Sequence, residues 1–479
     1  MDSALNIWIY ITLFASAAVA YLIIVRSDLR RRTPPLPPGR FGWPIIGEIL
    51  ELQRLNRSGK QDEFIEVRRK RFNRDIFKTS ILGEKTIAIC GAAGNKLVFT
   101  SEKSLVLTWW PPSLKKLFGD SFFTAPYDEA VRTRKVVTAF LQQEVMHQLV
   151  ERFDKTCKKC IEGDWIGNHK VLAFSLIKKY AFCVACDMFT SMDDKNWQAM
   201  ILKEFNILLK GVFELPIYIP GTRHFKAVKA AEVIKKELIK VIERKREMKN
   251  IHGKVEKDLI SHLMDTRDEN GNLLRDKEIA DNVILLMDSG HDTSSSAMMM
   301  LMKYLAEMPD CYQRVLEEQR EIISQKQSGE LLNKNDLQKM KYSWNVVNEV
   351  LRLSPPIQGM FRKAKEDFTY AGFSIPKDWV VWWTTRSTQS DPQYFPNPEI
   401  FDPERFDRDI ITPYSFVPFG GGPRMCPGKE FARVEILVFL HNLVRNFRWE
   451  LVFPDELISI DPMPTTPKGL PVYLYPHSN

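Results

Sequence analysis

The feature that most constrains this chain is a glycine- and proline-rich loop that leads directly into a long helical pattern. The loop reads Phe416-Val-Pro-Phe-Gly-Gly-Gly-Pro-Arg-Met-Cys426-Pro-Gly-Lys-Glu430. The helix predicted after it spans Lys429–Asn446, and its apolar residues recur at helical spacing: Phe431, Val434, Ile436, Leu437, Leu440 and Leu443. One face of this helix is therefore suited to burial, and Cys426 lies at its positive N-terminal end.

A thiolate at that position is stabilised by the helix dipole and by backbone N–H groups directed at the sulfur, which predicts a lowered pKa. The spacing Phe419-x-x-Gly422-x-Arg424-x-Cys426-x-Gly428 resembles the haem-binding loop of the cytochrome P-450 superfamily. The resemblance implies haem b with Cys426 as the axial iron ligand. It also implies that Phe419 packs near the sulfur, that Arg424 pairs with a haem propionate, and that Gly428 leaves room beside the ring. The alternative is a buried structural cysteine after a turn.

Composition narrows the class of partner. The chain has 479 residues with a net charge of +8, which favours a membrane surface or an acidic protein partner. A nucleic-acid partner is not expected, because no helix carries spaced basic residues with interleaved aromatic residues.

The cysteines indicate a reducing compartment. Their number, seven, is odd in a long chain, which argues against a disulfide framework. The pairs Cys157-x-x-Cys160 and Cys183-x-x-Cys186 resemble a zinc ribbon, but the gap between them is longer than usual, and buried thiols are the preferred interpretation. His291 has no second histidine at helical spacing, so a metal site there is not expected.

The N-terminus predicts a membrane anchor. Residues 3–25 carry no charged side chain and are long enough, as a helix, to cross a bilayer. A cluster of arginines follows: Arg26, Arg30, Arg31, Arg32 and Arg40. Because positive flanks stay cytosolic, residues 1–25 are predicted to be a single-pass anchor with the rest of the chain in the cytosol. The alternative, a signal-peptidase site at Ala18-Val-Ala20, fits less well because the first residues lack a basic side chain.

Residues 26–44 are predicted to be a basic and proline-rich hinge. Pro34-Pro-Leu-Pro-Pro-Gly39 cannot form a helix or a central strand, so it is predicted to be a stiff spacer. It resembles the proline hinge of microsomal members of the superfamily, which implies location in the endoplasmic reticulum membrane. The remainder, residues 45–479, is predicted to be the haem-thiolate catalytic domain.

The fold is predicted to be mainly α with a small β portion. Residues 75–90 alternate apolar and polar side chains around Leu82-Gly-Glu-Lys85, which predicts a β-hairpin. Helical patterns dominate from there to about Leu353, and residues 368–383 return to β with Ala371-Gly372 as the turn. The resemblance implies a cytochrome P-450 fold preceded by the transmembrane helix.

A long helix is predicted over residues 276–306, and a polar segment lies in its middle, Asp288-Ser-Gly-His-Asp-Thr-Ser-Ser-Ser296. Polarity in a buried helix requires a reason, and a hydroxyl bonded back to a carbonyl one turn earlier suits a proton relay. The segment resembles the acid-alcohol pair of the superfamily, although Ser289 stands where alanine or glycine is usual. The resemblance implies that Thr293 stabilises the iron–oxygen intermediate and that Asp292 connects it with solvent.

Further arginines are assigned by the resemblance. Glu349 and Arg352 lie one turn apart on a helix, and with Arg405 they resemble the buried Glu-Arg-Arg network that locks the core around the haem loop. Arg362 matches a propionate-binding position. Arg134 matches another, although Ala130 replaces the tryptophan that many relatives carry four residues earlier.

Two loops are implied to recognise substrate: Thr108-Trp-Trp-Pro-Pro112 and Phe213-Glu-Leu-Pro-Ile-Tyr-Ile-Pro-Gly221. The second is implied to lie near the membrane and to admit lipophilic substrate. The alternative is that their prolines simply end helices.

Within the superfamily, four strings resemble the plant clan that oxidises cyclic terpenoids: Gly91-Ala-Ala-Gly-Asn-Lys96, Trp109-Trp-Pro-Pro112, Pro220-Gly-Thr222 and Phe419-Gly-Gly-Gly-Pro-Arg-Met-Cys-Pro-Gly-Lys429. The resemblance implies a monooxygenase that inserts one atom of O2 into a C–H bond of a pentacyclic triterpene such as β-amyrin. C-28 is a candidate position, but relatives differ in the carbon attacked. Electrons are implied to come from NADPH through the flavin-containing NADPH-cytochrome P-450 reductase.

Three alternatives remain. The enzyme could be a diterpenoid hydroxylase of the taxane type, or a haem-thiolate isomerase or dehydratase that needs neither O2 nor a reductase. A non-catalytic haem carrier or sensor would bind haem without NADPH-dependent oxygen uptake. The acid-alcohol pair argues against the isomerase or dehydratase.

Overall fold

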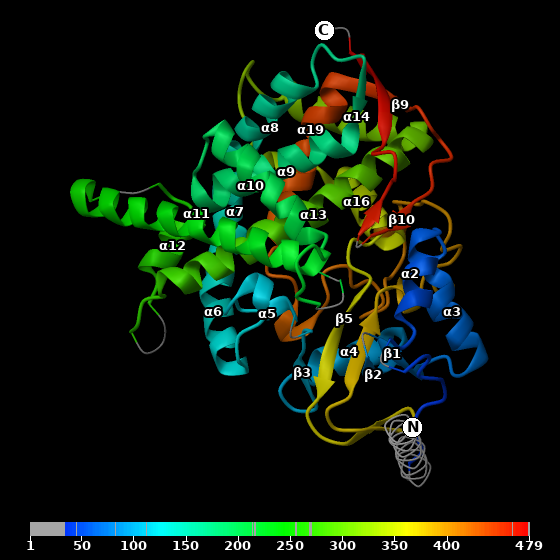
Figure 1. The fold of residues 1–479 in the computed structure, drawn as a ribbon. Helices are drawn as coiled ribbons and strands as arrows, with labels where there is room; N and C mark the ends of the chain where they lie inside the picture. Colours follow the sequence, from blue (N-terminus) through cyan, green and yellow to red (C-terminus); the bar gives the residue numbers. More distant parts are fainter. Residues whose placement is uncertain are drawn as a thin grey trace, which may run out of the picture.

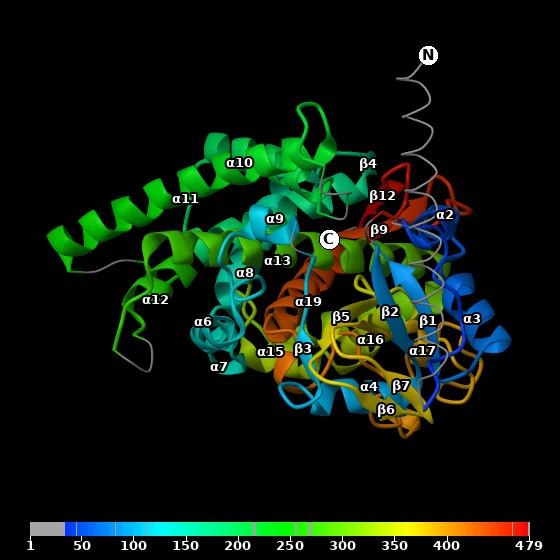
Figure 2. The ribbon, with the colours of Figure 1, turned by 60° about the horizontal axis from the view of Figure 1, so that its bottom comes forward.

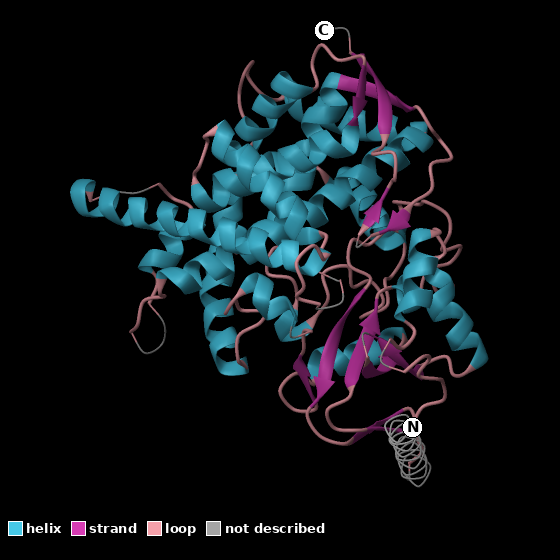
Figure 3. Cartoon of the chain, in the orientation of Figure 1, coloured by secondary structure: helices cyan, strands magenta, loops and turns pink. Residues whose placement is uncertain are grey.

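The computed structural model describes residues 34–477, apart from residues 45, 82, 112, 213, 215, 216, 254, 255, 268–270 and 462. Helices make up most of the described chain, and the strands lie at the periphery of the helical body (Figure 3). The main sheet is at the bottom of Figure 1, and strand β9, near the C-terminus, is at the top. The predicted fold class, mainly α with a small β portion, is thus confirmed.

The helices differ widely in length. They are α2 (Ile49–Arg57), α3 (Gln61–Arg71), α4 (Gly91–Thr100), α5 (Ser113–Phe118), α6 (Tyr127–Phe140), α7 (Gln143–Gln148), α8 (Val150–Asp164), α9 (Ala173–Thr190), α10 (Lys195–Leu209), α11 (Arg223–His252), α12 (Leu259–Asp265), α13 (Asp276–Glu307), α14 (Pro309–Ser324), α15 (Lys334–Lys339), α16 (Lys341–Leu353), α17 (Arg386–Gln389), α18 (Arg405–Arg408) and α19 (Lys429–Asn446), with a 3-10 turn η1 (Gly422–Arg424).

The strands are short. They are β1 (Ile76–Ile81), β2 (Glu84–Ile89), β3 (Val106–Thr108), β4 (Lys170–Leu172), β5 (Gly359–Ala364), β6 (Phe368–Tyr370), β7 (Phe373–Ile375), β8 (Val380–Thr384), β9 (Phe447–Leu451), β10 (Ser459–Ile460), β11 (Pro464–Thr465) and β12 (Pro471–Pro476).

Helix α13 runs through the middle of the helical body, with α19 beside it (Figure 2). It packs on α9, α11, α16 and α19. Because α19 is enclosed by other helices, it is buried on nearly all sides, and Glu435, His441 and Asn442 are buried together with its apolar residues. The sequence predicts only one buried face for α19, and this prediction is wrong. The periodicity of apolar residues does not show how many helices pack around a given helix.

The main sheet has five strands in the order β1-β2-β8-β5-β3. β1 and β2 form the predicted antiparallel hairpin, with Ile76 opposite Ile89, and β8 joins β2 in parallel. The predicted second hairpin is β6 and β7, and its turn residues Ala371 and Gly372 have φ angles of 50° and 81°. Strands β3, β4, β5 and β9 to β12 are not predicted from the sequence.

The described part of the predicted hinge lies against the sheets. The carbonyl of Pro38 accepts a hydrogen bond from the Lys78 backbone N–H (2.9 Å), and the carbonyl of Pro35 accepts one from Ser374 (2.9 Å). These residues belong to the folded body, although the sequence predicts a spacer there. No helix in the described part of the chain combines the length and apolar character needed to cross a membrane, and the predicted anchor, residues 1–25, lies outside the described residues.

Candidate active site

The loop before α19 is held in a conformation that only glycine allows. A Cβ on Gly421 would lie 2.5 Å from Cδ2 of Phe99, and a Cβ on Gly422 would lie 2.1 Å from the carbonyl oxygen of Phe99. Gly422 also has a φ of 65°. The backbone N–H of Cys426 donates a hydrogen bond to the carbonyl of Phe419 (2.8 Å) and closes the loop. The loop is therefore fixed between α4 and the start of α19.

Cys426 is accessible at the start of α19, although protein atoms crowd around it. Burial by these atoms raises the pKa of Cys426. The backbone N–H of Gly428 donates to the sulfur and, with the positive charge of Arg134, lowers this pKa less than burial raises it. The sequence predicts a lowered pKa, so the direction is wrong for the free thiol. A metal cation bound to the sulfur would deprotonate it outright.

Three arginines from different elements meet beside this loop. Arg134 of α6 donates to the carbonyl of Met425, Arg362 comes from β5, and Arg424 belongs to η1. Glu102 lies between Arg362 and Arg424. Burial lowers the pKa of Arg134 to about 10, and the positive charge of Arg424 contributes to the same shift.

The three guanidinium groups and one carboxylate carry a net charge of +2. The Nε of Arg362 and the Oε2 of Glu102 are buried without a hydrogen bond in the described chain. Buried positive charge of this kind is suited to a dianionic ligand, and a haem carries two propionates. The residues present therefore fit a haem bound next to Cys426.

A stripe of α13 is less buried than the rest of the helix. Between Glu278 and Lys303 every residue is buried except Ser289, Gly290 and Thr293, which lie on one side of the helix. The hydroxyl of Thr293 donates to the carbonyl of Ser289 (2.6 Å), one turn earlier, as expected from the sequence. The helix continues without a break across this polar segment.

Asp292, the neighbour of Thr293, is connected towards the surface by a lysine. Its Oδ1 lies 2.8 Å from Nζ of Lys178 on α9, and the side chains are 6% and 26% exposed. One turn before it, burial and the charge of Asp292 raise the pKa of Asp288 well above its usual value. The arrangement leads from a partly exposed lysine to a buried acid, which is the residue directly before Thr293.

The structure also brings Glu349, Arg352 and Arg405 together. Arg352 donates to both carboxylate oxygens of Glu349 at 2.8 Å, and Nε of Arg405 lies 3.1 Å from Oε1. The side chains are 0 to 2% exposed. Arg352 also donates to the carbonyls of Gln389 (2.8 Å) and Ile400 (3.2 Å), so the network ties α16 to the segment that precedes the cysteine loop.

Replacing Glu349 with alanine is expected to yield protein without haem. The change leaves two buried guanidinium groups unpaired, which typically costs about 3 to 5 kcal/mol. Haem content is measured from the Soret absorbance of the purified protein. Glu450→Ala removes an exposed carboxylate that pairs with Arg448 and is expected to leave haem content unchanged. A normal Soret spectrum in the Glu349 variant would refute the assignment.

Three polar residues at this site are not predicted from the sequence. Lys178 is far along the chain from Asp292, and Glu102 is far from the two arginines with which it pairs. Glu435 of α19 is buried, neither of its carboxylate oxygens has a hydrogen bond in the described chain, and burial raises its pKa to about 8. An acidic residue in a helical pattern predicts a solvent-exposed position, so the sequence gives no signal for it.

The predicted substrate segment after β3 lies next to β5. Trp109 contacts the ring of Phe361 edge to face (6.0 Å between centroids), and Trp110 stacks on Phe123 (4.8 Å). Phe361 directly precedes Arg362 on β5, and because successive strand residues point to opposite faces, its ring and the Arg362 guanidinium group lie on opposite sides of the sheet. Of the second predicted segment, residues 213, 215 and 216 lie outside the described chain, and Tyr218 is partly exposed.

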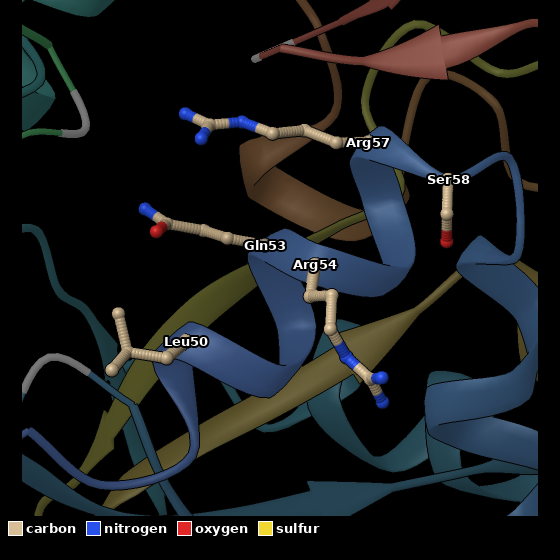
Figure 4. Close-up of a pocket in the computed structure, with 5 residues that line it drawn as sticks. All are labelled: Leu50, Gln53, Arg54, Arg57 and Ser58. Carbon is tan, nitrogen blue, oxygen red and sulfur yellow. The ribbon is translucent and has the colours of Figure 1, made fainter.

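A separate hollow on the surface does not belong to this site. It has a volume of about 420 Å³ and lies along α2, where its lining residues are Leu50, Gln53, Arg54, Arg57 and Ser58. Figure 4 shows Gln53 and Arg57 extending to the same side of the helix. The lining offers no cysteine, carboxylate or histidine, so it supplies neither a thiolate ligand for iron nor an acid that could deliver protons.

Comparison with known proteins agrees with this geometry. The family model described as Cytochrome P450 matches residues 37–470. A protein named beta-amyrin 28-monooxygenase from Kalopanax septemlobus is 44% identical over 466 residues, which cover 97% of each chain. Another of the same name, from Medicago truncatula, is 46% identical over 444 residues, covering 92% of this chain and 93% of its own.

A solved structure is also similar. The structure titled "Retinoic acid bound cyanobacterial CYP120A1" superposes with a TM-score of 0.84 at 31% sequence identity. It covers 92% of this chain and 100% of its own. The arrangement of helices and sheets is therefore shared over nearly the whole length.

Proposed function

Because this chain belongs to the cytochrome P450 family, we propose that it oxidises a pentacyclic triterpene of the β-amyrin type at C-28. The enzyme is a P450 monooxygenase that uses haem iron and electrons delivered from NADPH through a reductase. The observation that carries the substrate proposal is the near full-length identity to proteins named beta-amyrin 28-monooxygenase.

The residues that would hold the cofactor come from four elements. Cys426 would bind the iron, and Arg134, Arg362 and Arg424 would bind the propionates. When bound, haem supplies the activation of O2 and the insertion of one oxygen atom into a C–H bond. Phe419 packs against the helical core beside Cys426, and Gly428 lies next to the sulfur, because a Cβ there would be 3.9 Å from Sγ.

Proton delivery would use the α13 stripe. Lys178 is partly exposed to solvent, and its partner Asp292 is buried. Thr293 carries a hydroxyl on the half-buried stripe of α13, where it holds a hydrogen bond to Ser289. The hydroxyl can donate to a ligand beside the stripe when it releases that carbonyl, and Asp292 can then restore the proton.

Aromatic side chains would help to hold the substrate. Trp109, just after β3, and Phe361 of β5 offer large aromatic surface without charge. A pentacyclic hydrocarbon skeleton gains binding energy from such surface because its own surface leaves water.

The cellular setting is part of the proposal. The apolar residues 3–25 would anchor the enzyme in the endoplasmic reticulum membrane, with the catalytic domain in the cytosol, where the NADPH-cytochrome P-450 reductase can reach it. The net charge of +8 is suited to an acidic redox partner.

The experiment is expression of the full chain in yeast with a reductase and a panel of triterpene and diterpene scaffolds. We expect β-amyrin to give products oxidised at C-28, identified by mass spectrometry and NMR. Oxidation of taxane-type diterpenes alone would replace the substrate proposal. Conversion of hydroperoxides without NADPH would indicate the isomerase or dehydratase, and haem binding without oxygen uptake would indicate a carrier or sensor.

A further inference from the structure

A buried carboxylate bridges two arginines of the site. Oε1 of Glu102 is 3.1 Å from Nε of Arg424, and Oε2 is 3.3 Å from Nε of Arg362. The exposed fractions of these side chains are 3%, 9% and 6%, in that order. Glu102 follows α4, so it joins β5 and η1, which lie more than 250 residues later in the chain.

Glu102 is itself held in place. The backbone N–H and the hydroxyl of Thr108 both donate to its Oε1, at 3.3 Å and 3.1 Å. Its backbone pairs with Val106 in an isolated bridge. Thr108 of β3 therefore holds the Glu102 carboxylate in place, and the carboxylate in turn holds the two arginines.

The contacts leave the outer ends of the arginines available. Both arginines meet Glu102 through Nε, and a guanidinium group has five N–H donors. Arg362 uses Nη1 to donate to the carbonyl of Phe361 (3.0 Å). Within the described chain, the Nη atoms of Arg424 make no hydrogen bond, and the group lies over the ring of Tyr127 (5.0 Å to the centroid).

We propose that Glu102 is a positioning residue of the haem site, which holds Arg362 and Arg424 by their Nε edges so that their Nη groups face the propionates. Glu102 also screens the repulsion between these arginines and Arg134. This inference rests on the proposed haem binding beside Cys426.

The test compares Glu102→Gln with Glu48→Gln in the haem-loaded enzyme. Glu48 is a matched control, because it is also a buried carboxylate that accepts from two arginines and a threonine: Arg40 (2.6 Å), Arg68 (2.9 Å) and Thr79 (2.6 Å). It lies at the start of α2 and contacts none of the arginines of the site. A merely structural loss would therefore affect both variants alike.

Two properties are measured: the rate at which haem passes to excess apomyoglobin, and the propionate-bending band in the resonance Raman spectrum. We expect Glu102→Gln to release haem about tenfold faster than wild type, the effect of weakening one charge-assisted hydrogen bond, and to shift the band. We expect Glu48→Gln to match wild type in both. Equal release rates in the two variants, or an unshifted band in Glu102→Gln, would overturn the proposal.

If Glu102→Gln does not accumulate as folded protein, haem release is measured with Glu102→Asp instead. It keeps the charge but is one carbon too short to reach both Nε atoms from the Thr108 contact, so faster haem release is again expected. Release at the wild-type rate would refute positioning by Glu102. A wild-type protein that bound no haem would instead refute the proposed function, so the two failures are distinguishable.

Discussion

Replacing Cys426 with serine is expected to remove the red-shifted absorbance band of the reduced, carbon monoxide-treated protein and to lower triterpene oxidation by at least about 10²-fold. A serine hydroxyl deprotonates far less readily than a thiol, and its oxygen is a harder ligand than sulfur. The Gly428 N–H would then donate to a neutral hydroxyl and not to a thiolate. The measurements are the difference spectrum of the purified protein and product formation with reductase and NADPH.

A second thiol provides the control. Cys183 of α9 is likewise not fully buried, and its Sγ donates to Oε1 of Gln198 (3.7 Å). Cys183→Ser is expected to keep both the band and the activity. Persistence of the red-shifted band in Cys426→Ser would mean that another side chain supplies the anionic ligand, and the proposed site would be wrong.

The parts of the site that depend on local sequence could be predicted. Consecutive glycines, a proline and a cysteine before an apolar helical period define the loop, and α19 spans the predicted Lys429–Asn446. The predicted helix over residues 276–306 corresponds to α13, which ends one residue later. In both cases the signal is a periodicity or a turn requirement within a few residues.

Contacts between distant segments could not be predicted. Glu102 and Arg424 are 322 residues apart, and no local pattern connects them. Lys178 lies on a different helix from Asp292, so a search for charge pairs at helical spacing cannot find it. The sheet β4-β12-β9 could not be predicted either, since β12 pairs with β4 from the first half of the chain.

The pKa values of buried groups could not be predicted for the same reason, because burial depends on contacts between distant segments. From the sequence, the helix dipole and backbone N–H groups indicate a lowered pKa for Cys426. In the fold, burial reverses the direction. The same burial keeps Glu435 protonated near neutral pH, because its pKa rises to about 8. Both shifts depend on what surrounds α19, and the residues that surround it come from helices throughout the chain.

Replacing Asp292 with asparagine is expected to lower the turnover of triterpene by roughly 10²-fold and to increase the solvent isotope effect on turnover. Asparagine preserves the shape of the side chain but cannot carry a proton from Lys178 to Thr293. Haem content is expected to remain normal, because Asp292 contacts none of the three arginines. Turnover is measured in water and in heavy water with saturating reductase, so that electron delivery does not limit the rate.

Asp281→Asn separates proton transfer from the loss of a buried ion pair. Asp281 is on the same helix, its side chain is 2% exposed, and it pairs with Lys235 of α11. It lies about 16 Å along α13 from Asp292, at 1.5 Å per residue. We expect this variant to be less stable but to keep the wild-type isotope effect, because no proton for the reaction passes through it. An Asp292→Asn enzyme whose turnover and isotope effect equal those of Asp281→Asn would show that the Lys178–Asp292 pair only stabilises the packing of α9 on α13.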